Sequence, residues 1–109
     1  MQNLLIIDTY PTESDLKKME RLLDESKFRA NSAAIFLIDY GVFWLLDEFW
    51  DHLVKEDILF YAHAHDADKY TIPFKEEVIF SGMPALKQLM STVPNVYHFE
   101  DDTFFSEAS

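Results

Sequence analysis

Cysteine is absent from the 109 residues of this chain. A chain without cysteine has no disulfide framework, no thiolate nucleophile and no sulfur ligand for a metal ion. This composition fits a cytoplasmic location, which we expect for the protein. Glycine is nearly absent as well, because Gly41 and Gly82 are the only two, and neither belongs to a GxGxxG or GxxxxGKS/T motif. Phosphate-cradling loops of these two kinds are therefore excluded.

Basic residues are also few. Lys and Arg number 9 against 20 Asp and Glu, which makes the formal net charge -11. So acidic a chain lacks the basic clusters that bind nucleic-acid phosphates or anionic membrane surfaces. No apolar run approaches the length of a membrane-spanning helix, and the first, residues 4–7, is too short for a signal peptide and lacks a basic flank. We expect neither a nucleic-acid nor a membrane partner.

Short apolar runs recur along the chain, and they are the main signal for its fold. The runs at residues 3–8, 33–39 and 58–63 have almost no polar interruption, which is typical of strands covered on both faces. Shorter strands are expected at residues 77–80 and 96–99. The chain therefore predicts five strands.

Helical segments separate these runs. Thr12 and Asp15 form a T-x-x-D capping box, which predicts a helix that runs to about residue 27. A second helix is expected over residues 42–54, a short turn of helix over 66–70, and a last helix from Ser81, as its cap, to residue 90. The apolar stripes of the first two helices consist of Leu16, Met19, Leu22 and Leu23, and of Val42, Leu45, Leu46, Phe49 and Leu53.

Strands that alternate with helices predict one α/β domain over residues 1–109. We expect a three-layer sandwich, with a mostly parallel five-stranded sheet and helices on both faces. The third strand is expected beside the first. Residues 100–109 hold four acids and no base, and they are expected to form either a flexible acidic tail or an anchor docked through Phe104 and Phe105.

The helix expected over residues 42–54 is apolar on two faces. Its second stripe consists of Phe43, Trp44, Trp50 and Val54. Such a helix is either deeply buried or covered by another subunit. A domain of this size has few places to bury a whole helix, so we expect self-association with these four residues at the interface.

Polar side chains follow the first three predicted strands, at the edge where ligands bind in open α/β sheets. The candidate site residues are Asp8, Thr9, Tyr10, Asp39, Tyr40, Gly41, His63, His65 and Asp66. If the first two strands neighbour the third, Asp8 and Asp39 lie within reach of His63, and carboxylates beside a histidine could perform acid–base chemistry. Alternatively, Asp8 and Asp39 accept backbone N–H groups and begin the following helices.

His63 and His65 are also candidate metal ligands, because residues two apart at a strand end point the same way. The stretch resembles the HxHxDH motif of metallo-β-lactamase hydrolases. However, Ala67 stands where that motif needs Asp, and Asp68 stands where it needs His. We therefore expect no metal site and no other cofactor.

Four stretches of the chain resemble the DsrE/DsrF-like family of sulfur-relay subunits. They are NLLIIDTYP, IFLIDYGVFWLL, ILFYAHAHDADKYTI and EVIFSGMPALKQLM, and the strongest pattern is Asp39-x-Gly41-Val42 between a strand and a helix. The resemblance implies a five-stranded α/β sandwich that assembles as trimers or hexamers. Sulfur-carrying members keep a reactive cysteine at the end of the third strand, which corresponds here to His63 or a position within one residue of it. Members without that cysteine serve as structural partners.

Three functions follow as alternatives. The first is a non-catalytic subunit or binding module resembling sulfur-relay proteins, without persulfide chemistry of its own, that self-associates or pairs with another family member. The second is a small ligand-binding protein or enzyme that uses an Asp/His crevice at the strand ends. The third is a homo-oligomeric scaffold. We favour the first, and hence a protein that is not an enzyme.

Overall fold

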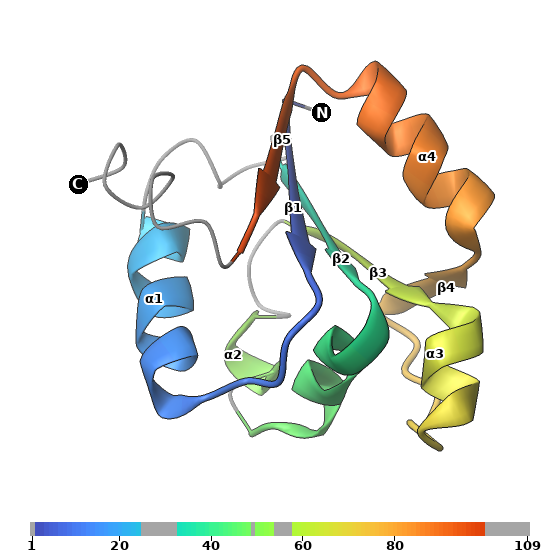
Figure 1. Ribbon diagram of the computed structural model, residues 1–109. Coiled ribbons are helices and arrows are strands. Elements are labelled where there is room, and N and C mark those ends of the chain that lie inside the picture. The colour runs from blue at the N-terminus through green and yellow to red at the C-terminus, as the bar shows by residue number, and fades with distance from the viewer. Residues whose placement is uncertain (1, 25–32, 49, 54–57, 100–109) are drawn as a thin grey trace.

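Five parallel strands form the centre of the computed structural model, which describes residues 2–24, 33–48, 50–53 and 58–99 (Figure 1). The strands are β1 Asn3–Ile7, β2 Ala33–Leu37, β3 Leu59–His63, β4 Val78–Ser81 and β5 Asn95–His98. Each lies within two residues of the position that its apolar run predicts. The prediction of a five-stranded parallel α/β sheet is therefore confirmed.

The strand order is β4-β3-β2-β1-β5. The expectation that the third strand lies beside the first is wrong, because β2 separates β1 from β3 and pairs with both. The right-handed crossover rule restricts the hand of each connection but not which neighbour the next strand takes. Here each of the first four strands adds beside its predecessor, and the chain then returns to the opposite edge, where β5 pairs with β1.

The first helix, α1 Glu13–Asp24, begins at the predicted capping box. The Thr12 amide donates to Asp15 Oδ2 at 3.2 Å, and the Asp15 amide donates to Thr12 Oγ1 at 3.1 Å. Its apolar stripe turns Met19 and Leu22 into the core. Two helices follow β3: α3 Ala64–Lys69 and α4 Met83–Thr92. The residue that caps α4 is Gly82, whereas the sequence had predicted Ser81.

The continuous helix expected over residues 42–54 does not form. A 3₁₀ helix, η2 Asp39–Leu46, is followed by the short α2 Trp50–Leu53, and Asp47 between them is extended, with ψ 143°. A 3₁₀ helix repeats every three residues. Burial in η2 follows that period, because Gly41, Val42, Trp44 and Leu45 are buried, whereas Tyr40 and Leu46 are exposed and Phe43 lies between.

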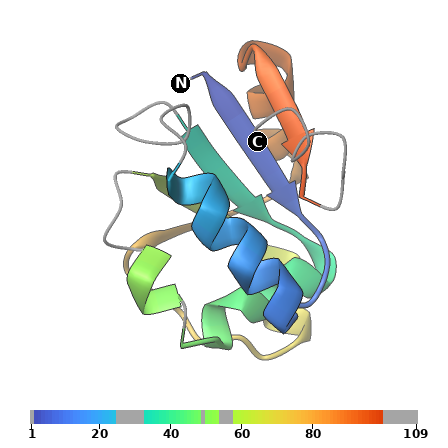
Figure 2. The same cartoon turned by 90° about the vertical axis from the view of Figure 1, so that its left-hand side faces the viewer.

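Helices cover both faces of the sheet, as the three-layer prediction required. Side chains from α1, η2, α2 and α3 pack on one face, and Leu86 and Val93 of the α4 segment pack against Leu4, Ile6, Ala34 and Phe36 on the other. Figure 2 shows α1 in front of the sheet and α4 behind it. None of the helices in the described part of the chain is long and apolar enough to cross a bilayer.

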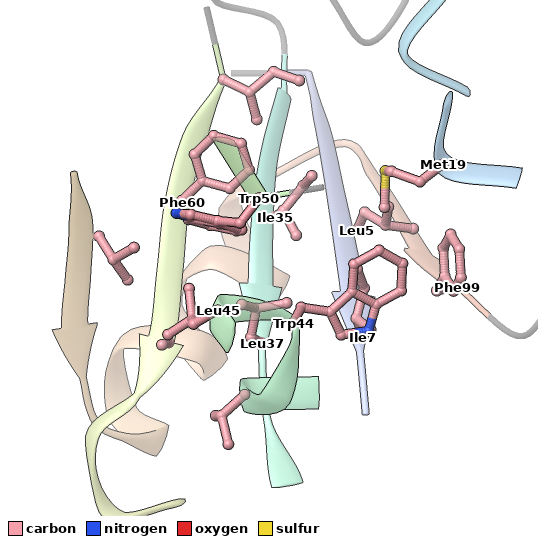
Figure 3. Packing of buried hydrophobic residues seen from close by; sticks show 14 of the residues in the cluster. Leu5, Ile7, Met19, Ile35, Leu37, Trp44, Leu45, Trp50, Phe60 and Phe99 are labelled. Atoms are coloured by element: carbon pink, nitrogen blue, oxygen red, sulfur yellow. The ribbon is translucent and has the colours of Figure 1, made fainter. Parts of the chain in front are cut away.

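The two tryptophans expected at a subunit interface lie inside the protomer. Trp44 and Trp50 are each 1% exposed, and Figure 3 shows Trp50 beside Phe60 over β3. Their assignment to an interface is therefore wrong, and the alternative of a buried aromatic segment holds for them. Phe43 is half-buried against this core, and Val54 lies outside the described residues.

Candidate functional site

The segments that follow β1, β2 and β3 meet at the carboxyl edge of the sheet. Figure 1 shows η2 and α3 beyond the arrowheads of β2 and β3. Parallel strands bring their carboxyl ends to one edge, so residues far apart in sequence become neighbours there. The candidate residues that the sequence singles out lie on these three segments.

Gly41 allows the chain to pass close to the end of β1. The Ile38 amide donates to the Ile7 carbonyl at 2.9 Å, and the Gly41 amide donates to the Ile38 carbonyl at 2.8 Å. A Cβ atom at position 41 would lie 2.0 Å from the Ile7 oxygen and 3.3 Å from Asp8 Cα. Gly41 thus serves close backbone packing. Asp39, two residues earlier, has φ 49°, a left-handed conformation that Asp and Asn tolerate better than most residues.

Asp66 is the centre of the polar contacts at this edge. Its Oδ2 accepts the Asp39 amide at 2.7 Å and lies 2.7 Å from His63 Nδ1. The side chains of His63 and Asp66 are 14% and 18% exposed. The sequence placed Asp8 and Asp39 beside His63, but Asp66 supplies the carboxylate that contacts it.

The surroundings of Asp66 favour its ionised form. Burial raises the pKa of Asp66, but the hydrogen bonds from the Asp39 amide and His63 lower it. Positive charge on His63 and His65 lowers it further, and the net result is a pKa below the ordinary 3.8. An ionised carboxylate only accepts hydrogen bonds, so His63 Nδ1 carries the proton of this contact, and Nε2 holds the lone pair whenever the ring is neutral. Asp66 therefore orients the His63 imidazole, so that its Nε2 can accept a hydrogen bond or act as a base.

Ser81 is a neighbour of this pair that the sequence analysis assigned to a helix cap. It is the last residue of β4 and pairs in register with His63 of β3. Its Oγ is buried and has no hydrogen-bond partner among the residues that the structure describes. A serine and a glycine directly after the apolar run VIF are the signal that could have indicated a strand end. Because the hydroxyl is shielded from solvent, it is not presented as a nucleophile.

Four aromatic rings form a second group at the same edge, which we call the tyrosine cluster: Tyr10, Tyr40, Phe43 and Tyr70. The Tyr10 ring stacks on Tyr40 at 4.9 Å between centroids and contacts Phe43 at 4.7 Å. Tyr70 completes the cluster, at 5.6 Å from Tyr40 and 5.0 Å from Phe43. Phe43 was expected at a subunit contact, whereas here it joins three tyrosines.

Polar groups tie the tyrosine cluster to its surroundings. The Tyr70 hydroxyl donates to Asp39 Oδ1 at 3.4 Å, and Lys69 Nζ lies 5.2 Å from the centre of the Tyr70 ring. Partial burial raises the pKa of Tyr70 above the ordinary 10.0, and the positive charge of Lys69 opposes that effect. Repulsion from the ionised form of Tyr40 and the negative charge of Asp39 raise the pKa of Tyr70 further, so its hydroxyl stays protonated and able to donate.

The remaining candidate residues play smaller parts in this arrangement. The Thr9 carbonyl accepts the indole N–H of Trp44 at 3.0 Å, and Asp8 is half-buried beside it. His65 is exposed, with its ring centre 6.1 Å from that of His63. Within residues 2–24, 33–48, 50–53 and 58–99, no group of three or more His, Cys, Asp or Glu side chains could hold a metal ion.

Asp66→Asn is expected to lower the free energy of unfolding by about 1–2 kcal/mol at neutral pH, because it removes a charged hydrogen-bond acceptor. A carboxylate with a depressed pKa stabilises the folded state above its unfolded pKa, and that contribution disappears as pH falls through the folded value. The difference between wild type and Asp66→Asn should therefore shrink below pH 3.8. Urea unfolding at neutral and acid pH measures it.

Asp68→Asn is the matched control, since Asp68 is an exposed acid of the same helix. It should change the free energy of unfolding by less than about 0.5 kcal/mol. A difference for Asp66→Asn that stays constant from neutral to acid pH would show that its charge is not the stabilising feature.

Comparison with known proteins supports the fold. No protein-family model matches the chain, and no curated protein sequence is similar to it. The solved structure of the ychN protein from E. coli is similar in fold, with a TM-score of 0.68 and 16% sequence identity over 90% of this chain and 99% of that one. That protein has a DsrE/DsrF-like fold, so the chain described above has this fold as well.

Proposed function

We propose that this chain is a non-catalytic subunit of the DsrE/DsrF-like kind, which binds other subunits and performs no persulfide transfer of its own. The fold supports the first half of the proposal. The second half rests on composition: the chain has no cysteine, so it has no thiolate to attack a sulfane sulfur. His63 ends β3, where the family's carriers keep their cysteine, and its ring is held by Asp66.

The observation that carries the binding role is an apolar sheet surface that α4 leaves uncovered, here called the open face: Leu59, Tyr61 and Ile79. These residues point to the α4 side of β3 and β4, and register pairs Tyr61 with Ile79. The α4 segment packs mainly on β1 and β2, and Tyr61, which is half-buried, borders that packed cluster. Leu59 is 48% exposed and Ile79 is 46% exposed. Apolar side chains grouped on an exposed sheet face are typical of a protein-binding surface.

The His63–Asp66 pair is better suited to binding than to catalysis. The imidazole is oriented, but the neighbouring hydroxyl of Ser81 is buried. Covalent catalysis needs a nucleophile within reach of the base and of the substrate. We therefore propose a cytoplasmic protein that assembles into trimers or hexamers, or that pairs with another subunit of the same fold.

Replacing Ile79 or Leu59 with lysine is expected to break up the assembly. An ammonium group in the centre of an apolar contact would have to be desolvated without a partner, which costs several kcal/mol. The wild-type protein should show a light-scattering mass of three or six times the 12.8 kDa protomer, and Ile79→Lys and Leu59→Lys should shift it toward 12.8 kDa.

Leu46→Lys is the control, because Leu46 is also an exposed apolar residue, 56% exposed, but belongs to η2 on the opposite side of the sheet. It should leave the mass unchanged. A wild-type protein that scatters only as the 12.8 kDa species would contradict self-association, and equal dissociation by Leu46→Lys would contradict the open face as the contact.

A further inference from the structure

The tyrosine cluster presents aromatic surface to solvent at the carboxyl edge of the sheet. Tyr10 is 50% exposed and Tyr40 is 44% exposed, although their rings stack with an interplanar angle of only 16°. Tyr10 also contacts Phe43 and Tyr40 also contacts Tyr70, so each of the two rings has a second aromatic neighbour. The cluster draws on three segments, after β1, after β2 and after β3, and so it exists only in the folded protein.

Carboxylates lie on each of the three segments that carry these rings. Asp39 directly precedes Tyr40, and its carboxylate accepts the Tyr70 hydroxyl. Asp8 precedes the Tyr10 loop, and Asp68 is exposed on α3. Solvent-accessible tyrosine rings attract cations, and nearby carboxylates strengthen that attraction. Phosphate or carboxylate ligands would be repelled at such a surface.

Lys69 shows that the cluster already holds a cation. Its Nζ lies 5.2 Å from the centre of the Tyr70 ring, within the range of a cation–π contact. Lys69 is the basic residue between Asp66 and Tyr70, on the segment after β3 that contributes Tyr70 to the cluster. Its ammonium group lies over the Tyr70 ring. The half-exposed pair of Tyr10 and Tyr40 remains available for a cation from another molecule.

We propose that the tyrosine cluster docks an arginine-bearing segment of a partner protein. A guanidinium group is planar and weakly hydrated, so it stacks on an aromatic face while its N–H groups bond a carboxylate such as that of Asp39. This proposal names the chemistry of a partner and thus rests on the binding role proposed above. It uses a surface distinct from the open face, because Leu59 and Ile79 lie on the strands and the cluster lies beyond the strand ends.

The test measures binding of a fluorescein-labelled peptide with the repeat Arg-Gly-Ser by fluorescence anisotropy, with a Glu-Gly-Ser peptide as the counterpart. The arginine peptide should bind the full chain and the glutamate peptide should not. Binding should weaken as salt is raised, because the charges at this exposed edge are screened. Equal binding of the two peptides would overturn the proposal.

Variants locate the surface. Tyr40→Ala should weaken binding about two- to fivefold, the effect of one exposed cation–π contact, and Tyr40→Phe should weaken it less because the ring stays. Asp39→Asn should also weaken binding while keeping a residue that tolerates the left-handed backbone. Lys69→Gln should strengthen binding, because it removes a competing cation. Phe74→Ala removes a ring that is 75% exposed outside the cluster and should change nothing.

Two outcomes separate this proposal from the one it rests on. If Tyr40→Ala, Asp39→Asn and Phe74→Ala bind the arginine peptide as the wild type does, the attraction comes from overall acidity and the docking surface is wrong, whatever the light-scattering mass. Chemical-shift mapping on the wild type provides the same decision without substitutions: the proposal requires the largest changes at the Tyr10 and Tyr40 ring protons and is overturned if they lie elsewhere.

Discussion

Gly41→Ala is expected to destabilise the protein by about 3 kcal/mol or more, enough to leave much of it unfolded at moderate temperature. The added Cβ would lie 2.0 Å from the Ile7 oxygen and 2.7 Å from the Ile7 carbonyl carbon. Both are backbone atoms, and the Ile7 oxygen already accepts the Ile38 amide. Relief would require η2 to move away from the end of β1. Thermal and urea unfolding followed by circular dichroism would measure the loss.

Gly82→Ala provides the comparison within the same chain. The nearest atom to a Cβ at position 82 is Pro84 Cδ at 3.4 Å, an ordinary contact. Gly82 caps α4 with φ -100°, which alanine adopts without strain. We expect a change within about 1 kcal/mol, the usual range for an N-cap substitution. Similar stabilities for the two alanine variants would show that the close approach at Gly41 is not required.

Trp50→Ala is expected to lower the free energy of unfolding by about 3–5 kcal/mol, the usual cost of truncating a buried aromatic residue. The Trp50 ring is 1% exposed and meets Phe60 edge to face at 4.7 Å between centroids. Its Nε1 donates to Glu77 Oε1 at 2.9 Å. The substitution would open a cavity over β3 and leave Glu77 without this donor. Chemical denaturation at several protein concentrations would measure the effect.

The concentration series separates the core role from an interface role. If Trp50 were a subunit contact, Trp50→Ala would change the light-scattering mass and make stability depend on protein concentration. Trp50→Phe should recover most of the packing but not the indole donor. The bond from that donor is the main cause of the low pKa of Glu77, so this pKa should rise toward 4.5 in Trp50→Phe. An unchanged Glu77 titration in this variant would contradict the hydrogen bond.

Strands β1 and β2 were predictable because strands buried on both faces need apolar side chains at every position, and the chain provides such runs there. The apolar run of β3 also predicted a strand, but its expected cover on both faces is wrong, because burial alternates along it and Leu59 is exposed. The first helix was predictable because its capping box is a local contact. Strand order was not, since it depends on which neighbour each crossover reaches. The segment 42–54 was predicted as one continuous α-helix, and the 3₁₀ helix η2 was missed, because an apolar stretch fits a three-residue and a 3.6-residue period almost equally well.

The candidate site was predictable in its location but not in its contacts. Parallel strands place Asp39, His63 and Asp66 at one edge of the sheet whatever the order of the strands, so these site residues could be named from the sequence. Which carboxylate meets His63 depends on the direction of α3, and this made Asp66 the partner instead of Asp8. Ser81 was missed because strand β4 runs one residue further than its apolar run.

The pairing of β5 with β1 has a consequence for how the protein is made. Asn3 pairs with Asn95, and Ile6 pairs with His98, so β1 cannot complete its hydrogen bonds until β5 has been synthesised. A ribosome adds residues from the N-terminus, and β1, β2, β3 and β4 can join one after another as they emerge. Throughout that time the outer edge of β1, with its Leu-Leu-Ile-Ile run, has no strand beside it. The nascent chain thus carries an unpaired apolar strand edge until β5 has emerged from the ribosome, and a chaperone could protect that edge during this interval.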